Sequence, residues 1–183
     1  MRLLGVVLSG GQSRRFGSDK ALGVFDGGPL IAHALTALAG CDALAVVGRE
    51  WLGVASLPDR PSPDLGPLGG LNAALHRAAT HGFSHVASVP VDCPGLPGDW
   101  LARLANGPAH AMGQPLIGLW PVTLVTGLAA FLGSGQRRVQ LWVAGTGACG
   151  AALGPPANVN KAEDLAVTAS AVGGNMDSQK GNP

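Results

Sequence analysis

Residues 3–11 read LLGVVLSGG, an apolar run over residues 3–8 that is followed at once by Ser9, Gly10 and Gly11. A short apolar run without polar alternation is typical of a strand buried on both faces of a sheet. The run superficially resembles a signal peptide, but two arginines follow it and no small-residue cleavage site is present. The stretch therefore predicts a buried first strand that leads into a glycine-rich loop.

Short apolar runs and longer segments with helical spacing alternate along the chain after this strand. Such alternation predicts βαβ units, and therefore an α/β fold with a mostly parallel sheet that helices cover on both faces. The predicted strands are residues 3–8, 43–47, 86–89 and 115–119, and the predicted helices are residues 30–38, 68–79, 99–104 and 123–132.

The length and hydrophobic content predict one domain with a full-sized core. The chain has 183 residues, of which 46% are hydrophobic. Residues 168–183 contain Gly, Ser, Asn and Lys without apolar periodicity, so we predict a disordered tail there and a folded domain over residues 1–167.

Charge and cysteine content exclude several functional classes. The 12 basic and 11 acidic residues nearly cancel, which argues against a nucleic-acid partner or a polybasic membrane surface. No apolar run reaches the roughly 18 residues of a spanning helix. Cys41, Cys93 and Cys149 are far apart and form no C-x-x-C pair, so neither a disulfide framework nor a zinc site is predicted. This pattern fits a protein of the reducing cytoplasm.

The loop after the first strand has the composition of a phosphate site. Gly10 and Gly11 allow backbone N–H groups to approach an anion, and Arg15 and Lys20 add positive charge. The loop matches neither the dinucleotide fingerprint G-x-G-x-x-G nor the P-loop pattern. The alternative is a glycine-rich surface loop whose charges are solvated.

Two later segments also have the composition of a site. Residues 59–70, DRPSPDLGPLGG, predict a rigid turn that enters a helix, with glycines that would permit either close packing or approach of a ligand. Asp92 follows a predicted strand, where a lone carboxylate beside a phosphate site is a natural Mg²⁺ ligand. Alternatively, Asp92 caps a turn, and Cys93 is interpreted as a small packed residue.

Taken in order, these segments closely resemble the molybdenum cofactor guanylyltransferases. Residues 8–22 read LSGGQSRRFGSDKAL and residues 28–33 read GPLIAH. The family pattern is roughly L-[AS]-G-G-x-S-x-R-[MF]-G-x-D-K-[AG]-L and then G-x-P-L-x-x-H. Residues 66–70, GPLGG, and residues 90–97, PVDCPGLP, resemble the family segments G-P-L-[AG]-G and P-x-D-x-P-x-[LI]-P.

The resemblance implies a single Rossmann-like nucleotidyltransferase domain and assigns roles to the candidate residues. It implies that Arg15, Lys20 and Asp92 are catalytic and that Asp92 binds Mg²⁺. The residues that it implies for nucleotide binding are Leu8, Ser9, Gly10, Gly11, Lys20, Asp59, Gly66 and Asp92.

The C-terminal third adds candidates for the acceptor side. Residues 135–139, GQRRV, resemble the family's G-x-R-[RS]-V, and residues 158–165, NVNKAEDL, resemble N-[IV]-N-T-P-E-[DE]-L. Arg137, Arg138, Asn158 and Asn160 are therefore candidates. For the arginines a solvated helix start is the alternative, and for the asparagines it is a turn with an N-cap.

The implied reaction transfers GMP from GTP to the molybdopterin form of the molybdenum cofactor and releases pyrophosphate. Cofactor-inserting chaperones or molybdoenzymes are the expected further partners. One departure bears on the base: the family has an asparagine that contacts guanine where this chain has Gly48. Cytidylyl transfer to the same acceptor is therefore an alternative, as is a non-catalytic nucleotide-binding protein that takes part in cofactor delivery.

Overall fold

The computed structural model describes residues 1–10, 20–104 and 107–154, which form a seven-stranded sheet with helices on both faces. The strand order is β5-β4-β1-β6-β8-β7-β9. The strands are β1 Leu3–Leu8, β4 Ala43–Val47, β5 Ala55–Leu57, β6 His85–Pro90, β7 Ala109–Ala111, β8 Gln114–Pro121 and β9 Cys149–Ala151, and a separate hairpin pairs β2 Val24–Phe25 with β3 Gly28–Pro29. The α-helices are α1 Leu30–Ala37, α2 Pro67–Thr80, α3 Trp100–Arg103, α4 Val125–Gly133 and α5 Val139–Thr146, with 3₁₀ turns η1 Lys20–Leu22 and η2 Val122–Leu124.

The sheet is mostly parallel. β1 pairs in parallel with β4 and β6, β4 with β5, and β7 with β9, whereas β8 runs antiparallel to both β6 and β7. From β1 the chain first moves outward to β4 and β5 and then returns to β6 on the other side of β1. Open α/β sheets bind ligands at such a reversal, beyond the carboxyl ends of the strands.

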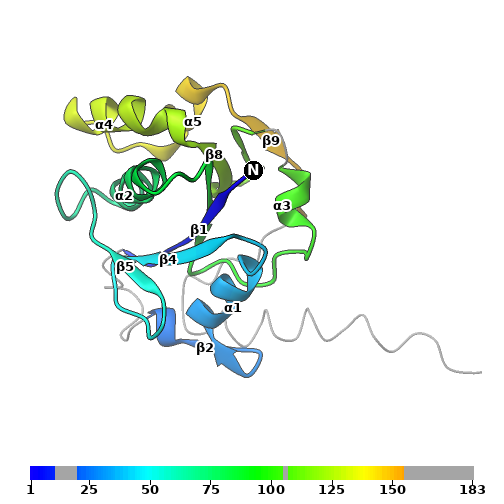
Figure 1. The fold of residues 1–183 in the computed structure, drawn as a ribbon. Helices are drawn as coiled ribbons and strands as arrows, with labels where there is room; N and C mark the ends of the chain where they lie inside the picture. Colours follow the sequence, from blue (N-terminus) through cyan, green and yellow to red (C-terminus); the bar gives the residue numbers. More distant parts are fainter. Residues whose placement is uncertain (11–19, 105–106, 155–183) are drawn as a thin grey trace, which may run out of the picture.

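The core has one apolar layer on each face of the sheet. Successive side chains of a strand point to opposite faces, so Leu3 and Val7 of β1 join the cluster beneath α1 and α3, while Leu4 joins the cluster beneath α2, α4 and α5. Figure 1 shows α1 and α3 on one side of the sheet and α2, α4 and α5 on the other. Burial on both faces explains why the strand β1 is apolar without alternation.

The predicted fold class is confirmed, and the differences lie in short or weakly patterned elements. The helix expected at 123–132 begins as the 3₁₀ turn η2 and becomes α-helical only at Val125. The strands β5, β7 and β9 were not predicted, since three residues are too few to show a periodicity. The helix α5 was also missed, because its apolar residues show little preference for one face.

Several predictions fall outside the described residues. These are the roles of Gly11, Arg15, Asn158 and Asn160, the last part of the predicted domain at 155–167, and the predicted tail at 168–183.

Candidate active site

Three neighbouring parallel strands end at the same edge of the sheet, and their following residues form a cavity. In the register, Leu8 of β1 lies opposite Val47 of β4 and Pro90 of β6. Ser9 N–H donates to the Val47 carbonyl and Val91 N–H donates to the Leu8 carbonyl, each at 3.1 Å, so the pairing extends past the strand ends. The cavity has a volume of about 430 Å³ and lies at this edge.

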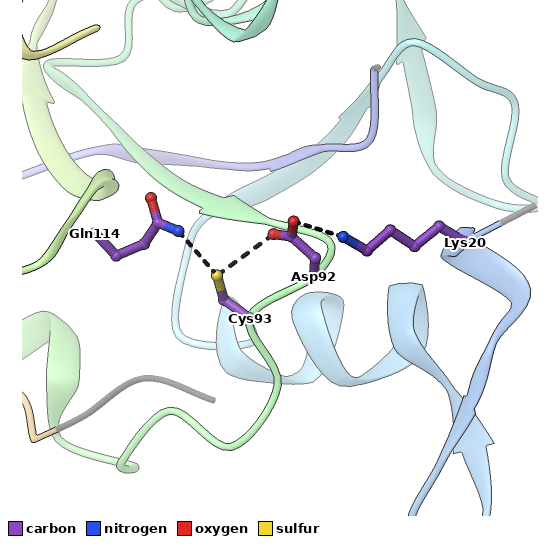
Figure 2. A network of polar contacts seen from close by, with 4 residues as sticks. All are labelled: Lys20, Asp92, Cys93 and Gln114. Carbon is purple, nitrogen blue, oxygen red and sulfur yellow. Dashed lines mark hydrogen bonds and ion pairs between the residues drawn. The ribbon is translucent and has the colours of Figure 1, made fainter. Parts of the chain in front are cut away.

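The first cavity brings together most of the residues predicted at strand ends. Lys20 Nζ donates to Asp92 Oδ2 at 2.9 Å, and the two side chains are only 17% and 26% exposed (Figure 2). Ser9 Oγ is buried and has no hydrogen-bond partner within the described part of the chain. The predicted residues that line this cavity are Leu8, Ser9, Gly10, Lys20 and Asp92.

A second cavity of about 670 Å³ adjoins the first and holds the other predicted nucleotide residues. Asp59 and Gly66 line it, together with Asp64. Burial raises the pKa of the Asp59 carboxyl above its ordinary value, and the negative charge of Asp64 raises it further. Gly66 has a φ of +66° and immediately precedes α2, so it makes the sharp entry to that helix.

The two cavities meet at a waist formed by Gly10, Gly48 and Arg49, which line both. Gly48 has a φ of +85°, and a Cβ placed on it would lie 2.6 Å from the Cα of Gly10. Any side chain at this position would therefore both strain the backbone and collide with the loop after β1. The structure gives a local reason for glycine where the family has an asparagine.

Sequence reasoning missed Arg49 and Asp64. Arg49 directly follows Gly48 at the end of β4, and its carbonyl accepts a hydrogen bond from Ser56 Oγ at 2.9 Å, which ties it to β5. The available signal was its position after a predicted strand, at the edge of the sheet where Asp92 was expected. Asp64 has a φ of +61°, and its place opposite Asp59 depends on the turn before α2.

The two acceptor-side arginines that the structure describes lie between α4 and α5. Arg137 donates through Nη1 to the carbonyls of Leu132 at 2.8 Å and Gln136 at 2.6 Å, and the Leu132 carbonyl at the end of α4 also accepts from the Gly135 N–H. Arg138 precedes the first residue of α5. Neither arginine lines the two cavities.

The Asp92 carboxylate fits a magnesium ion that takes most of its other oxygen ligands from phosphates and water. Mg²⁺ takes oxygen ligands, commonly one or two carboxylates, with phosphates and water completing the shell. Asp92 presents one partly exposed carboxylate to the first cavity. Within residues 1–10, 20–104 and 107–154 no group of three His, Cys, Asp or Glu side chains could hold a metal by itself. Asp92 is therefore suited to a metal that arrives with phosphates.

Together, the fold and the site define an α/β domain with two joined ligand cavities at the carboxyl edge of its sheet, at the point where the strand order reverses. A sequence model of the MobA-like NTP transferase domain matches residues 5–145. The chain belongs to this family.

Individual proteins support the same family. A molybdenum cofactor guanylyltransferase of Rhodobacter capsulatus is 38% identical over 179 residues, covering 91% of this chain and 94% of that protein. Among solved structures, molybdopterin-guanine dinucleotide biosynthesis protein A of Archaeoglobus fulgidus has a TM-score of 0.75 at 18% identity, covering 92% of this chain and 98% of that one.

The fold alone does not distinguish between bases. The 2-C-methyl-D-erythritol 4-phosphate cytidylyltransferase of Thermus thermophilus has a TM-score of 0.69 at 15% identity, covering 91% of this chain and 97% of that one. Proteins named for guanine and for cytosine nucleotides therefore share this architecture. Among the described helices, none has the length and apolar character needed to cross a membrane.

Proposed function

We propose that this protein transfers the GMP unit of GTP to the molybdopterin form of the molybdenum cofactor, with release of pyrophosphate. The observation that carries the proposal is the Lys20–Asp92 pair, which faces a cavity at the end of β1 and β6. The guanylyltransferase name of a relative that is 38% identical over most of both chains supports the choice of substrates.

The chemistry needs charge neutralisation and alignment more than a strong base. A terminal phosphate oxygen of the acceptor attacks the α-phosphorus of GTP, a new P–O bond forms, and the bond to the β-phosphate oxygen breaks. The attacking oxygen is already anionic, so no residue has to remove a proton from it. Positioning and electrostatic stabilisation then supply most of the rate enhancement.

The proposal assigns a role to each of the candidate site residues. The backbone of Gly10 receives the phosphates, and Lys20 neutralises charge that grows on them. Asp92 would hold Mg²⁺, which supplies charge neutralisation on the triphosphate when it is bound. Arg15 is proposed as a second cation, and Arg137, Arg138, Asn158 and Asn160 remain predicted acceptor-side residues.

The second cavity is proposed to read the base through Asp59. A carboxylate accepts hydrogen bonds through two oxygens, and guanine offers both a ring N–H and an amino group on one edge. The corresponding edge of cytosine offers only an amino group. Arg49, at the waist, is proposed to contact the nucleotide between its base and its phosphates.

The test of the reaction is pyrophosphate release from each of the four ribonucleoside triphosphates, with molybdopterin as acceptor and Mg²⁺ present. We expect GTP to be the best substrate by tenfold or more, since one lost base contact costs about 1–3 kcal/mol. A preference for CTP would identify the cytidylyltransferase alternative. Tight GTP binding without pyrophosphate release would identify the non-catalytic alternative.

Asp64 gives a pH-dependent prediction about base binding. If ionised Asp59 binds guanine, GTP affinity falls as the pH drops through the pKa of Asp59, which burial and Asp64 raise. Replacing Asp64 with asparagine removes one of the causes that raise this pKa. We therefore expect Asp64→Asn to shift the acid loss of GTP affinity to lower pH, as measured by calorimetric titration at a series of pH values.

Asp26→Asn is the matched control for this experiment. Asp26 also has a positive φ, of 42°, and it lies in the turn between β2 and β3, outside both cavities. It tests the same chemical change in the same backbone conformation, and its pH profile should match the wild type. An unchanged acid limb in Asp64→Asn would contradict the assignment of Asp59 as the ionised base contact.

A further inference from the structure

A chain of hydrogen bonds runs from β8 to the carboxylate of Asp92. Gln114 Nε2 donates to Cys93 Sγ at 3.4 Å, and Cys93 Sγ donates to Asp92 Oδ1 at 3.4 Å. Lys20 holds the other carboxylate oxygen, Oδ2, at 2.9 Å. Figure 2 shows the four side chains in a row, with Cys93 between Gln114 and Asp92. Both oxygens of Asp92 therefore have a partner, one from each side.

The chemistry of the groups fixes which atom donates and which accepts in each of these hydrogen bonds. An ionised carboxylate only accepts hydrogen bonds, and a thiol has a single proton to donate. The proton of Cys93 is therefore directed to Asp92, and the sulfur is left to accept from the amide of Gln114. Figure 2 shows the amide oxygen of Gln114 turned away from the sulfur, which is consistent with this direction.

Burial fixes the position of the Cys93 side chain that donates to Asp92. Cys93 is 1% exposed, so water has little access to its side chain, and it packs in the cluster beneath α1 and α3. Asp92, in contrast, follows β6 in an irregular segment and lines the first cavity. A thiol held by the core therefore fixes the position of one carboxylate oxygen, while Lys20 holds the other.

Gln114 adds an anchor from a different strand. It is the first residue of β8, which pairs with β6 in antiparallel register, and its side chain reaches across to the segment after β6. Its amide donates to the sulfur from the side opposite Asp92. The position of the thiol therefore depends on β8 as well as on its own loop.

We propose that Cys93 and Gln114 are positioning residues that orient the Asp92 carboxylate for metal binding. This inference rests on the proposed function, in which Asp92 is the Mg²⁺ ligand. In this role neither residue contacts the metal; Cys93 is buried, whereas Gln114 also lines the first cavity. Partners behind a metal ligand commonly change metal affinity by about 10–100-fold when they are removed.

The test measures Mn²⁺ binding by electron paramagnetic resonance in the presence of GTP, so that it does not depend on turnover. We expect Cys93→Ala and Gln114→Leu each to weaken Mn²⁺ binding about tenfold or more. Cys93→Ser keeps a donor at the same position and should stay within about threefold of the wild type. GTP binding measured in EDTA should be unchanged in the two Cys93 variants. The same measurement on Gln114→Leu separates an effect on the metal from an effect on GTP, because Gln114 also lines the first cavity.

Matched controls separate the loss of these hydrogen bonds from general effects of substitution. Cys149→Ala removes an exposed cysteine, and Gln140→Leu removes an exposed glutamine on α5; neither residue lines a cavity. Both should bind Mn²⁺ like the wild type. Thermal unfolding of each variant confirms that it is folded. Gln114→Leu removes the hydrogen bond to Cys93 without opening a space in the core.

The outcomes distinguish this inference from the proposed function. Mn²⁺ affinities of Cys93→Ala and Gln114→Leu within twofold of the wild type would overturn the positioning role and leave the metal role of Asp92 intact. Equal losses in Cys93→Ser and Cys93→Ala would also overturn it, because packing rather than the donated proton would then be responsible. Undiminished Mn²⁺ binding by Asp92→Asn would overturn the metal role itself.

Discussion

Replacing Asp92 with asparagine is expected to lower Mg²⁺-dependent pyrophosphate release about 10³-fold or more. Asparagine keeps the shape of the side chain but removes the negative charge that would hold the metal, and it also removes the ionic partner of Lys20. Metal stabilisation of a transition state is worth several kcal/mol, and each 1.4 kcal/mol corresponds to about tenfold in rate. The rate should be measured as pyrophosphate release with GTP and acceptor at saturating concentration.

Asp99→Asn is the control for the Asp92 variant. Asp99 pairs with Arg103 at 2.9 Å at the exposed start of α3, and it lines neither cavity. The same chemical change there should leave the rate within about twofold of the wild type, because exposed ion pairs contribute little. Full transfer by Asp92→Asn at ordinary Mg²⁺ concentration would show that Asp92 is not a metal ligand.

Gly48→Ala is expected to reduce the free energy of unfolding by about 3 kcal/mol. A left-handed backbone costs a side-chain-bearing residue about 1–2 kcal/mol, and overpacking adds about 1–3 kcal/mol. Both costs apply at Gly48, since its φ is +85° and its added Cβ would lie 2.6 Å from the Cα of Gly10. Urea unfolding followed by circular dichroism measures the loss.

Gly53→Ala separates these two costs. Gly53 has a similar φ of +79°, but nothing lies within 4 Å of an added Cβ. This variant should lose only the backbone share of about 1–2 kcal/mol. Equal destabilisation of the two variants would mean that the loops after β1 and β4 separate easily, and the close contact at the waist would then have no energetic weight.

The Gly48 geometry also refines the meaning of the departure from the family pattern. From the sequence, glycine at this position only removes an expected guanine contact. The structure adds that Gly10 leaves no room for a side chain in the present backbone. Gly48→Asn is therefore not a simple graft of the family residue, and position 48 contributes no side chain to base preference in this chain.

The parts of the fold and site that could be predicted are those that depend on local pattern. The apolar run at 3–8 and the run at 86–89 identified β1 and β6, and the residues that follow buried parallel strands were expected to meet at one edge. Lys20 and Asp92 do meet there. The placement of Asp59 in a nucleotide pocket came from the family resemblance, because a turn rich in proline and glycine does not by itself identify a ligand.

The parts that could not be predicted depend on contacts between distant residues. The hydrogen bonds that link Gln114 to Asp92 through Cys93 cross from β8 to the loop after β6, and no spacing in the sequence reveals them. Cys93 was correctly interpreted as packed, yet its hydrogen bonds follow only from the tertiary structure. Burial and the neighbouring carboxylate raise its thiol pKa far above the ordinary value, so it is unsuited to act as a nucleophile.

In the proposed function, the waist separates the cavity assigned to the base from the cavity assigned to the phosphates. Of the three described residues that form it, only Arg49 has a side chain, and Pro58, Asp59 and Asp64 line the second cavity but not the first. The segment 58–66 could therefore be redesigned to accept another nucleobase while the phosphate end of the site stays intact. In the proposed function, the site would then consist of a base part and a phosphate part that meet at Gly10, Gly48 and Arg49.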